Sequence, residues 1–266
     1  MRKIFFSLAA LATTVSFSHF QMINTENLNT DSKDIKFDIM FTHPASNGHS
    51  MDIGKNIKGE IKPVEAFILT KGDKVIDAKS KLVETKFGKK GNKALAYSYN
   101  FNFKEGLRPG LWSVLFVPAP YYEKSEDIYI KQATKVFLHK GEIEDETWAD
   151  KKMPKGEPEI LPHINPSQIW VGQVFVGQVV DGEGKPVKNC TIEVEFRNYD
   201  VKNGQFVGKE KTSHSEAVIK TDINGMFSFV PTTKGQWGFA ALGAGGEKTL
   251  DGKEVSHDAV LWIEAQ

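Results

Sequence analysis

The sequence has a single cysteine, no excess of charge of one sign and no long apolar run beyond its first residues. The lone Cys190 excludes a disulfide within the chain and any site built from several cysteines, such as an iron–sulfur cluster. The 34 lysines and arginines balance 34 aspartates and glutamates, which argues against a nucleic-acid binder. No stretch after residue 18 has the ~20 apolar residues of a membrane-spanning helix, so we expect no integral membrane protein.

The first 18 residues have the pattern of a secretory signal peptide. Two basic residues precede an apolar stretch at 4–15 that is too short to cross a bilayer. Two pairs of small residues, at 10 and 12 and at 16 and 18, compete as cleavage signals, and the second pair leaves the fuller apolar region. We therefore predict cleavage between Ser18 and His19 and a periplasmic mature protein.

Alternating apolar and polar residues predict an all-β fold of two sandwich-like domains, because turn-separated strands follow one another without a long amphipathic helix. The alternation also places Cys190 on a buried face. In the first half, the expected strands are residues 36–43, 64–69, 74–78, 94–103, 111–117 and 128–138. In the second half, they are residues 170–180, 190–196, 226–230, 233–240 and 258–264.

The composition changes between the two sets of strands. An acidic run and four prolines occupy residues 141–167, which we predict to be a linker because proline cannot donate to a sheet interior. The predicted units are thus a signal peptide at 1–18, a β domain with a metal site at 19–140, and a β-sandwich at 168–266. The last of these resembles immunoglobulin-like modules of the transthyretin and collagen-adhesin kind, through residues 177–187 and 221–227.

Histidine gives the clearest indication of chemistry. Residues 41–52 read Phe-Thr-His-Pro-Ala-Ser-Asn-Gly-His-Ser-Met-Asp, so that His43, His49 and Met51 lie in one segment that a proline and a glycine bend. After cleavage, His19 offers two further donors, its α-amine and a ring nitrogen. These donors predict a site for a borderline ion such as nickel, copper or zinc, and not for calcium or magnesium. The alternative is that they are exposed loop residues.

The remaining histidines carry weaker indications. His257, just before the final expected strand, either joins the same site or forms a hydrogen bond at a strand edge. His139, His163 and His214 have no partner in sequence, and we expect them at the surface. Neither a phosphate-binding glycine loop, a nucleophile elbow nor a zinc-protease motif occurs, so we expect a binding protein and not an enzyme.

Several short motifs point to one family. They are His19-Phe20, Phe41-Thr42-His43-Pro44 with Gly48, Tyr129-Ile130-Lys131-Gln132-Ala133-Thr134-Lys135, Glu159-Ile160-Leu161-Pro162, Asp222-Ile223-Asn224-Gly225, Gly235-Gln236-Trp237 and Ser256-His257-Asp258-Ala259-Val260-Leu261. Over about residues 19–266, the chain resembles the exported NikK-like proteins of unknown function, whose genes accompany nickel and cobalt uptake transporters of the energy-coupling-factor type. The resemblance implies a periplasmic protein that captures nickel or cobalt and hands it to a membrane transporter, with ligands at His19 and in the His43 loop.

Two other functions stay open. A terminal histidine on a β-sandwich is also the copper site of lytic polysaccharide monooxygenases, which makes a copper oxidoreductase the competing enzyme hypothesis. Met51 disfavours it, because thioethers oxidise during such turnover. The third hypothesis is an adhesive or scaffolding module with incidental histidines. Metal titration separates the first two hypotheses from the third.

Overall fold

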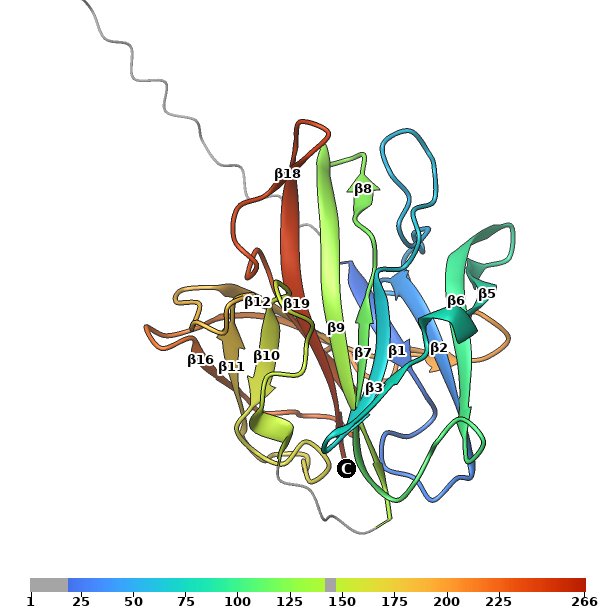
Figure 1. The fold of residues 1–266 in the computed structure, drawn as a ribbon, viewed down its shortest axis with the longest axis vertical. Coiled ribbons are helices and arrows are strands. Elements are labelled where there is room, and N and C mark those ends of the chain that lie inside the picture. The colour runs from blue at the N-terminus through green and yellow to red at the C-terminus, as the bar shows by residue number, and fades with distance from the viewer. Residues whose placement is uncertain (1–18, 142–146) are drawn as a thin grey trace, which may run out of the picture.

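The computed structural model describes residues 19–141 and 147–266, and these residues confirm the all-β prediction (Figure 1). The predicted signal peptide at 1–18 and residues 142–146 of the predicted linker lie outside the described residues. Within the described ranges, no helix combines the length and the apolar character that crossing a membrane would require.

The first half contributes nine strands and a short 3₁₀ helix among the described residues. They are β1 (Phe20–Asn24), β2 (Asp34–Thr42), β3 (Ala66–Lys71), β4 (Lys74–Asp77), η1 (Lys79–Lys81), β5 (Val83–Lys89), β6 (Asn92–Asn102), β7 (Gly110–Val117), β8 (Tyr121–Glu123) and β9 (Ile128–Lys140). The expected strands of this half are all present, whereas β1, β5 and β8 were not expected.

The described part of the second half continues with ten strands and a second 3₁₀ helix. They are η2 (Thr147–Ala149), β10 (Glu159–Pro162), β11 (Phe175–Val180), β12 (Thr191–Phe196), β13 (Asp200–Val201), β14 (Phe206–Val207), β15 (Glu216–Lys220), β16 (Met226–Phe229), β17 (Gly235–Ala241), β18 (Thr249–Leu250) and β19 (Lys253–Ala265). The strand expected from residue 170 begins only at Phe175, because Trp170 to Gln173 close a turn in which Gln173 N–H donates to Trp170 O.

A ten-stranded sheet runs through both halves. Its main path is β15-β12-β17-β19-β9-β7-β3-β4, and in Figure 1 the parallel pair β9 and β19 stands in the middle of the molecule. A four-stranded sheet, β1-β2-β6-β5, covers the first half of it, and a three-stranded sheet, β10-β11-β16, covers the second half. Each half is thus a sandwich, as predicted, and the two sandwiches share one layer.

Aromatic residues fill both sandwich cores. In the first, the ring of Phe101 on β6 lies 5.0 Å from that of Trp112 on β7. In the second, the rings of Phe175 on β11 and Phe239 on β17 stack at 5.0 Å. All four side chains are fully buried or nearly so. Burial of this much apolar area is the main force that holds each pair of sheets together.

Part of the predicted linker is a strand. β10 pairs with β11, and its residues Glu159, Ile160 and Pro162 are buried. Pro162 is tolerated because β10 is an edge strand and Pro162 is its last residue. The acidic Glu159 enters the interior because the Lys135 ammonium donates a hydrogen bond to it. Strand pairing therefore begins again before residue 168.

Cys190 is buried, as the alternation predicts, and its exposed fraction is 6%. Burial, assisted by the nearby negative charge of Asp258, raises the pKa of the thiol to about 11. We expect a thiol reagent such as Ellman's reagent to label the native protein far more slowly than the urea-unfolded protein at pH 8, because the thiolate is the reactive form. Equal labelling rates in the two states would contradict this burial.

Candidate metal centre

Three of the four predicted ligands meet at one end of the β1–β2 pair. One ring nitrogen from each of His19, His43 and His49 lies within 4.8 Å of the others. The ring centroids of His19 and His43 are 4.6 Å apart, and that of His49 lies 5.0 Å from His43. His19 and His43 are buried, whereas His49 is exposed. The cluster therefore has two interior imidazoles and one that faces solvent.

Strand register places His19 beside His43. β1 and β2 are antiparallel, and their last pair at this end joins Phe20 to Thr42. His19 directly precedes β1 and His43 directly follows β2. The two histidines therefore occupy adjacent positions at this end of the strand pair.

The loop after β2 turns back to present His49. Met51 N–H donates to Phe41 O at 2.9 Å, which closes the loop at its base. Gly48 is needed for the return path, since a Cβ at this position would lie 2.7 Å from Cδ2 of His43. Any side chain at position 48 would therefore displace the imidazole.

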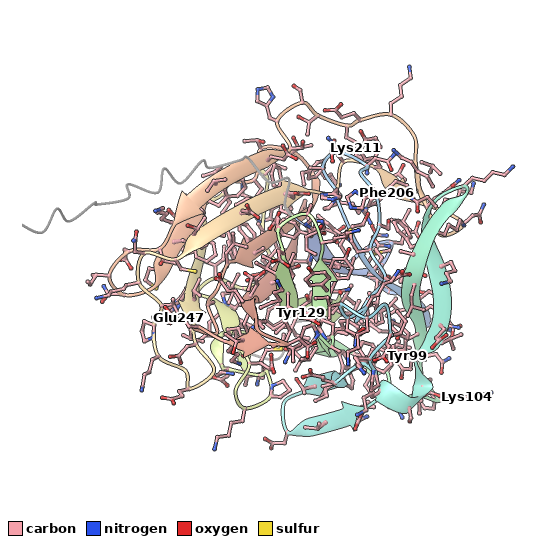
Figure 2. All side chains as sticks on the ribbon, turned by 90° about the horizontal axis from the view of Figure 1, so that it is seen from above. Tyr99, Lys104, Tyr129, Phe206, Lys211 and Glu247 are labelled. Carbon is pink, nitrogen blue, oxygen red and sulfur yellow. The ribbon has the colours of Figure 1, made fainter. Side chains whose placement is uncertain are left out.

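The second half of the chain holds this loop in place. Asn198, which follows β12 and is fully buried, donates its backbone N–H to Pro44 O at 3.1 Å and its side-chain amide to Ala45 O at 3.2 Å. The Glu195 carboxylate accepts the Ala45 N–H at 3.1 Å, and burial raises the pKa of Glu195 well above its usual value. The segment from Asn198 onward then continues over the first half, past the Phe206 and Lys211 labelled in Figure 2. Residue types alone did not indicate these contacts.

A buried polar chain fixes the backbone of His19. Gln132 on β9 donates its amide to His19 O at 2.7 Å and accepts Gln21 N–H at 2.7 Å. The same Gln132 amide also donates to Asp258 at 3.2 Å. Asp258 is held in turn by Ser256 Oγ and Gly243 N–H, and burial raises its pKa. The start of β1 is therefore tied to the parallel pair β9–β19.

Glu123 on β8 supplies a carboxylate beside the imidazoles. Its Oε2 lies 3.2 Å from Nε2 of His19. Burial works to raise the pKa of Glu123, but hydrogen bonds from Ser125 and the nearby His19 and His49 outweigh it and hold that pKa below its usual value. Burial, with a contribution from His49, lowers the pKa of His19 to about 4 despite Glu123. The interior imidazole is therefore neutral at pH 7, the state in which it binds metals.

Some buried polar atoms at the cluster make no hydrogen bond with the described residues. A pair of them is Nε2 of His19 and Oε2 of Glu123, which lie close together without hydrogen-bonding geometry. Unsatisfied buried polar atoms are rare and costly, and a bound ion is one way to satisfy them. The donors present therefore fit a borderline transition-metal ion.

Met51 lies in the hydrophobic core beside this cluster. It is almost fully buried and pairs with Phe41, whose ring lies 5.7 Å from that of His19. The thioether of Met51 as a ligand stays a prediction.

The comparisons with known proteins give a family and no activity. Residues 16–245 match the model of a family described as "Domain of unknown function (DUF4198)". The chain belongs to the DUF4198 family. No curated protein matches it.

Solved structures that match this DUF4198 protein resemble it only weakly. The mouse nectin-like molecule 4 ectodomain matches at 10% identity and a TM-score of 0.23, over 92% of this chain and 62% of that one. The E. coli alpha-2-macroglobulin matches at 11% identity and a TM-score of 0.22, over 94% of this chain and 14% of that one. The DUF4198 chain spans less than two thirds of each, and such TM-scores bear on neither fold nor function.

His257 of the DUF4198 protein belongs to a different cluster. Its Nε2 donates to Glu157 at 2.7 Å, and its Nδ1 accepts from the Lys248 ammonium at 2.7 Å. Glu157 also accepts from Lys131 at 2.7 Å. His257 is therefore a buried structural histidine that joins β19 to the segment before β10. It does not join the cluster of His19, His43 and His49. His163 and His214 are exposed, as expected, and His139 is half-buried.

The Glu157 cluster should give the protein a measurable acid sensitivity. Burial works to raise the pKa of Glu157, but the hydrogen bonds from His257 and Lys131 outweigh it and lower that pKa to about 2. The carboxylate therefore stabilises the fold fully above its unfolded pKa of 4.5, and this contribution is lost as the pH falls toward about 2. We expect Glu157→Gln to lower the free energy of unfolding at pH 7 and to matter progressively less below pH 4.5. Urea unfolding over this pH range checks it, and a constant difference at every pH would contradict it.

Proposed function

We propose that this DUF4198 protein captures nickel or cobalt in the periplasm and delivers it to a membrane uptake transporter. The observation that supports it is the convergence of His19, His43 and His49, two of them buried, on one point. Neutral imidazoles suit nickel, cobalt, copper and zinc. The family resemblance to NikK-like proteins favours the first two ions.

The exposure of one ligand of the cluster, His49, suits a carrier that must release its metal ion. The backbone of His19 is held by a buried hydrogen bond from Gln132, and the ring of His43 is buried beside that of His19, whereas His49 faces solvent. A ligand at the surface lets a partner replace it without opening the core. In this proposal, the interior histidines recognise the ion, and His49 is the ligand exchanged at the transporter.

Titration of nickel into the protein cleaved after Ser18 tests the proposal. We expect one ion per chain, loss of that binding in His43→Ala, and full binding in the exposed control His214→Ala. Delivery is tested in cells that grow on limiting nickel, where deletion of the gene should lower nickel uptake and His43→Ala should not restore it. Absence of saturable binding, or uptake that does not depend on the gene, would overturn the proposal.

The copper hypothesis is the second candidate because His19 and His43 stand next to each other, as the two histidines of a copper brace must. The same mature protein loaded with copper is then tested for peroxide-driven oxidation of cellulose and chitin. Release of oxidised sugars that disappears in His43→Ala would favour an oxidoreductase over a carrier. A metal carrier gives no such product.

A further inference from the structure

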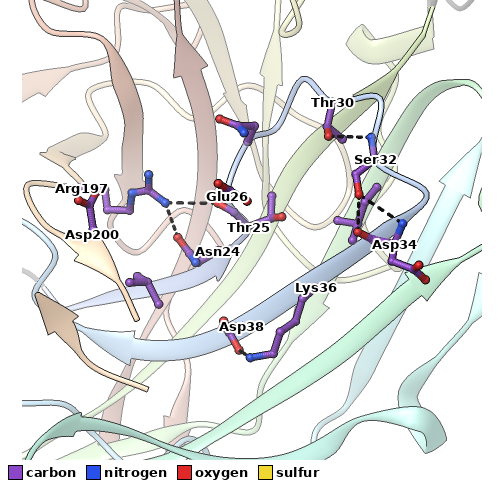
Figure 3. A pocket seen from close by; sticks show the side chains of 13 residues that line it. Asn24, Thr25, Glu26, Thr30, Ser32, Asp34, Lys36, Asp38, Arg197 and Asp200 are labelled. Carbon is purple, nitrogen blue, oxygen red and sulfur yellow. Dashed lines mark hydrogen bonds and ion pairs between the residues drawn. The ribbon is translucent and has the colours of Figure 1, made fainter. Parts of the chain in front are cut away.

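A second candidate site lies at the opposite end of β1 and β2 from the histidines. It is a cavity of about 670 Å³ between the end of β1, the start of β2 and β13 of the second half (Figure 3). This volume lies in the range of small-molecule sites. Its lining residues include Asn24, Thr25, Glu26, Asp34, Arg197 and Asp200.

Arg197 gives the cavity a positively charged group whose hydrogen-bond donors are only partly satisfied by the described residues. Its Nη1 donates to Asn24 Oδ1 at 2.6 Å and to Thr25 O at 3.3 Å. Its Nε is buried without a hydrogen-bond partner among the described residues. In this part of the chain, no carboxylate lies within ion-pair distance of the guanidinium, and the nearest acids, Glu264 and Asp200, act on it from farther away.

A partly buried guanidinium without a carboxylate is costly, and its Nη2, for which the described residues provide no hydrogen bond, can donate to a carboxylate from a ligand. Arg197 therefore indicates that an anionic group binds at this wall. Asp200 does not supply that group, because it pairs with Lys211 at 2.7 Å.

The rest of the cavity favours positive charge. Glu26 and Asp34 are exposed at its edge and make no ion pair within the described ranges, whereas Asp38 is paired with Lys36 at 2.7 Å. Figure 3 shows Arg197 on one side of the view and Asp34 on the other. Among the residues that the structure describes, no aromatic ring lines the cavity, which argues against a ligand held by stacking.

We propose that this cavity binds a small zwitterion, an amino acid or short peptide. Its carboxylate is held by the Arg197 guanidinium, and its ammonium group lies toward Glu26 and Asp34. The remaining amide and hydroxyl groups of the wall hydrogen-bond to the peptide backbone. This site is separate from the histidine cluster and does not depend on metal binding.

Calorimetric titration with triglycine at up to about 10 mM tests the site on the native protein. We expect saturable binding that weakens by at least about tenfold for triglycine amide, because a charge-assisted hydrogen bond is lost. N-acetyl triglycine should also bind more weakly, because it has no ammonium group. Absence of saturable binding by triglycine, or equal affinity for the free and the blocked peptides, would overturn the proposal.

Variants of both walls locate the binding. Arg197→Gln should lose at least about tenfold in triglycine affinity, and Arg197→Lys should recover only part of it, since a lysine does not reproduce the planar guanidinium. Glu26→Gln, at an exposed position, should weaken triglycine without changing the thermal midpoint of unfolding. All three variants should bind nickel with the affinity of the unmodified protein. Normal nickel binding shows that a variant is folded, so that a loss of triglycine affinity then reports a lost contact in the cavity. Unchanged triglycine affinity in folded Arg197→Gln would place the binding elsewhere.

Discussion

Nickel affinity should fall by more than about a hundredfold in His19→Ala, which is a larger loss than changes to the residues around a ligand usually cause. His19 offers a ring nitrogen next to its α-amine, so its loss removes the chelate as well as one imidazole. The ring is also the ligand that the fold prepares most completely. It is buried, it is neutral at pH 7, and Gln132 fixes its backbone. Calorimetric titration of the mature protein measures the effect.

A variant with one extra glycine before His19 separates the contribution of the α-amine to nickel binding from that of the imidazole. In that variant, the imidazole is unchanged, but the α-nitrogen is an amide and no longer binds metals at neutral pH. We expect its nickel affinity to fall clearly, though less than in His19→Ala. Equal affinity with and without the glycine would show that the imidazoles bind alone and that processing does not assemble the site.

The other ligands should follow in the order His43, His49 and Met51. His43→Ala should cost at most as much as His19→Ala, because only one donor is lost from a buried position. His49→Ala should cost less, since the exposed ring is less fixed, and Met51→Leu should cost least. His214→Ala is the matched control, because it removes an exposed histidine far from the cluster in sequence. A loss in His214→Ala as large as in His49→Ala would mean that the titration reports surface binding.

The sequence was sufficient to predict that His19, His43 and His49 lie together, but not how they are brought together or that Glu123 lies beside them. His43 and His49 are visible as neighbours in one bent segment, and His19 follows from the cleavage pattern. That His19 lies beside His43 depends on the pairing of Phe20 with Thr42, and β1, which provides this pairing, was not expected. The contacts of Glu195 and Asn198 with the loop join residues about 150 positions apart, and no local pattern encodes such a contact.

Alternation made some of the strands predictable. β2 and β12 alternate and were expected with nearly their observed bounds. The ten-stranded sheet was not expected, because the parallel pairing of β9 with β19 joins residues more than 120 positions apart. β9 is buried on both faces, although it carries Lys131, Gln132 and Lys135. Such polar residues usually indicate an exposed face, and they are accommodated here because each has a buried partner.

The most consequential of these partners is Glu159, and we expect Glu159→Gln to lower the free energy of unfolding by about 3 kcal/mol, the usual cost of removing one member of a buried ion pair. The Lys135 ammonium donates to the Glu159 carboxylate, and both side chains are almost fully buried. Burial lowers the pKa of Lys135, and Glu159 opposes this effect. Without the carboxylate, the ammonium is either buried without compensation or loses its proton. Urea unfolding at pH 7 measures the loss.

Two further variants separate charge from packing at this pair. Lys135→Met combined with Glu159→Gln leaves no buried charge, while the amide oxygen introduced at position 159 can still accept the N–H groups of Lys152 and Met153 that Glu159 accepts now. This double variant should therefore recover much of the stability that Glu159→Gln loses, because a buried ion pair and an apolar replacement of similar volume are often close in energy. Glu183→Gln is the matched control, since Glu183 pairs with Lys185 at 2.6 Å and both side chains are exposed to solvent. Its removal should cost less than about 1 kcal/mol. If Glu159→Gln costs no more than Glu183→Gln, the Lys135–Glu159 pair is not what holds β10 against β9.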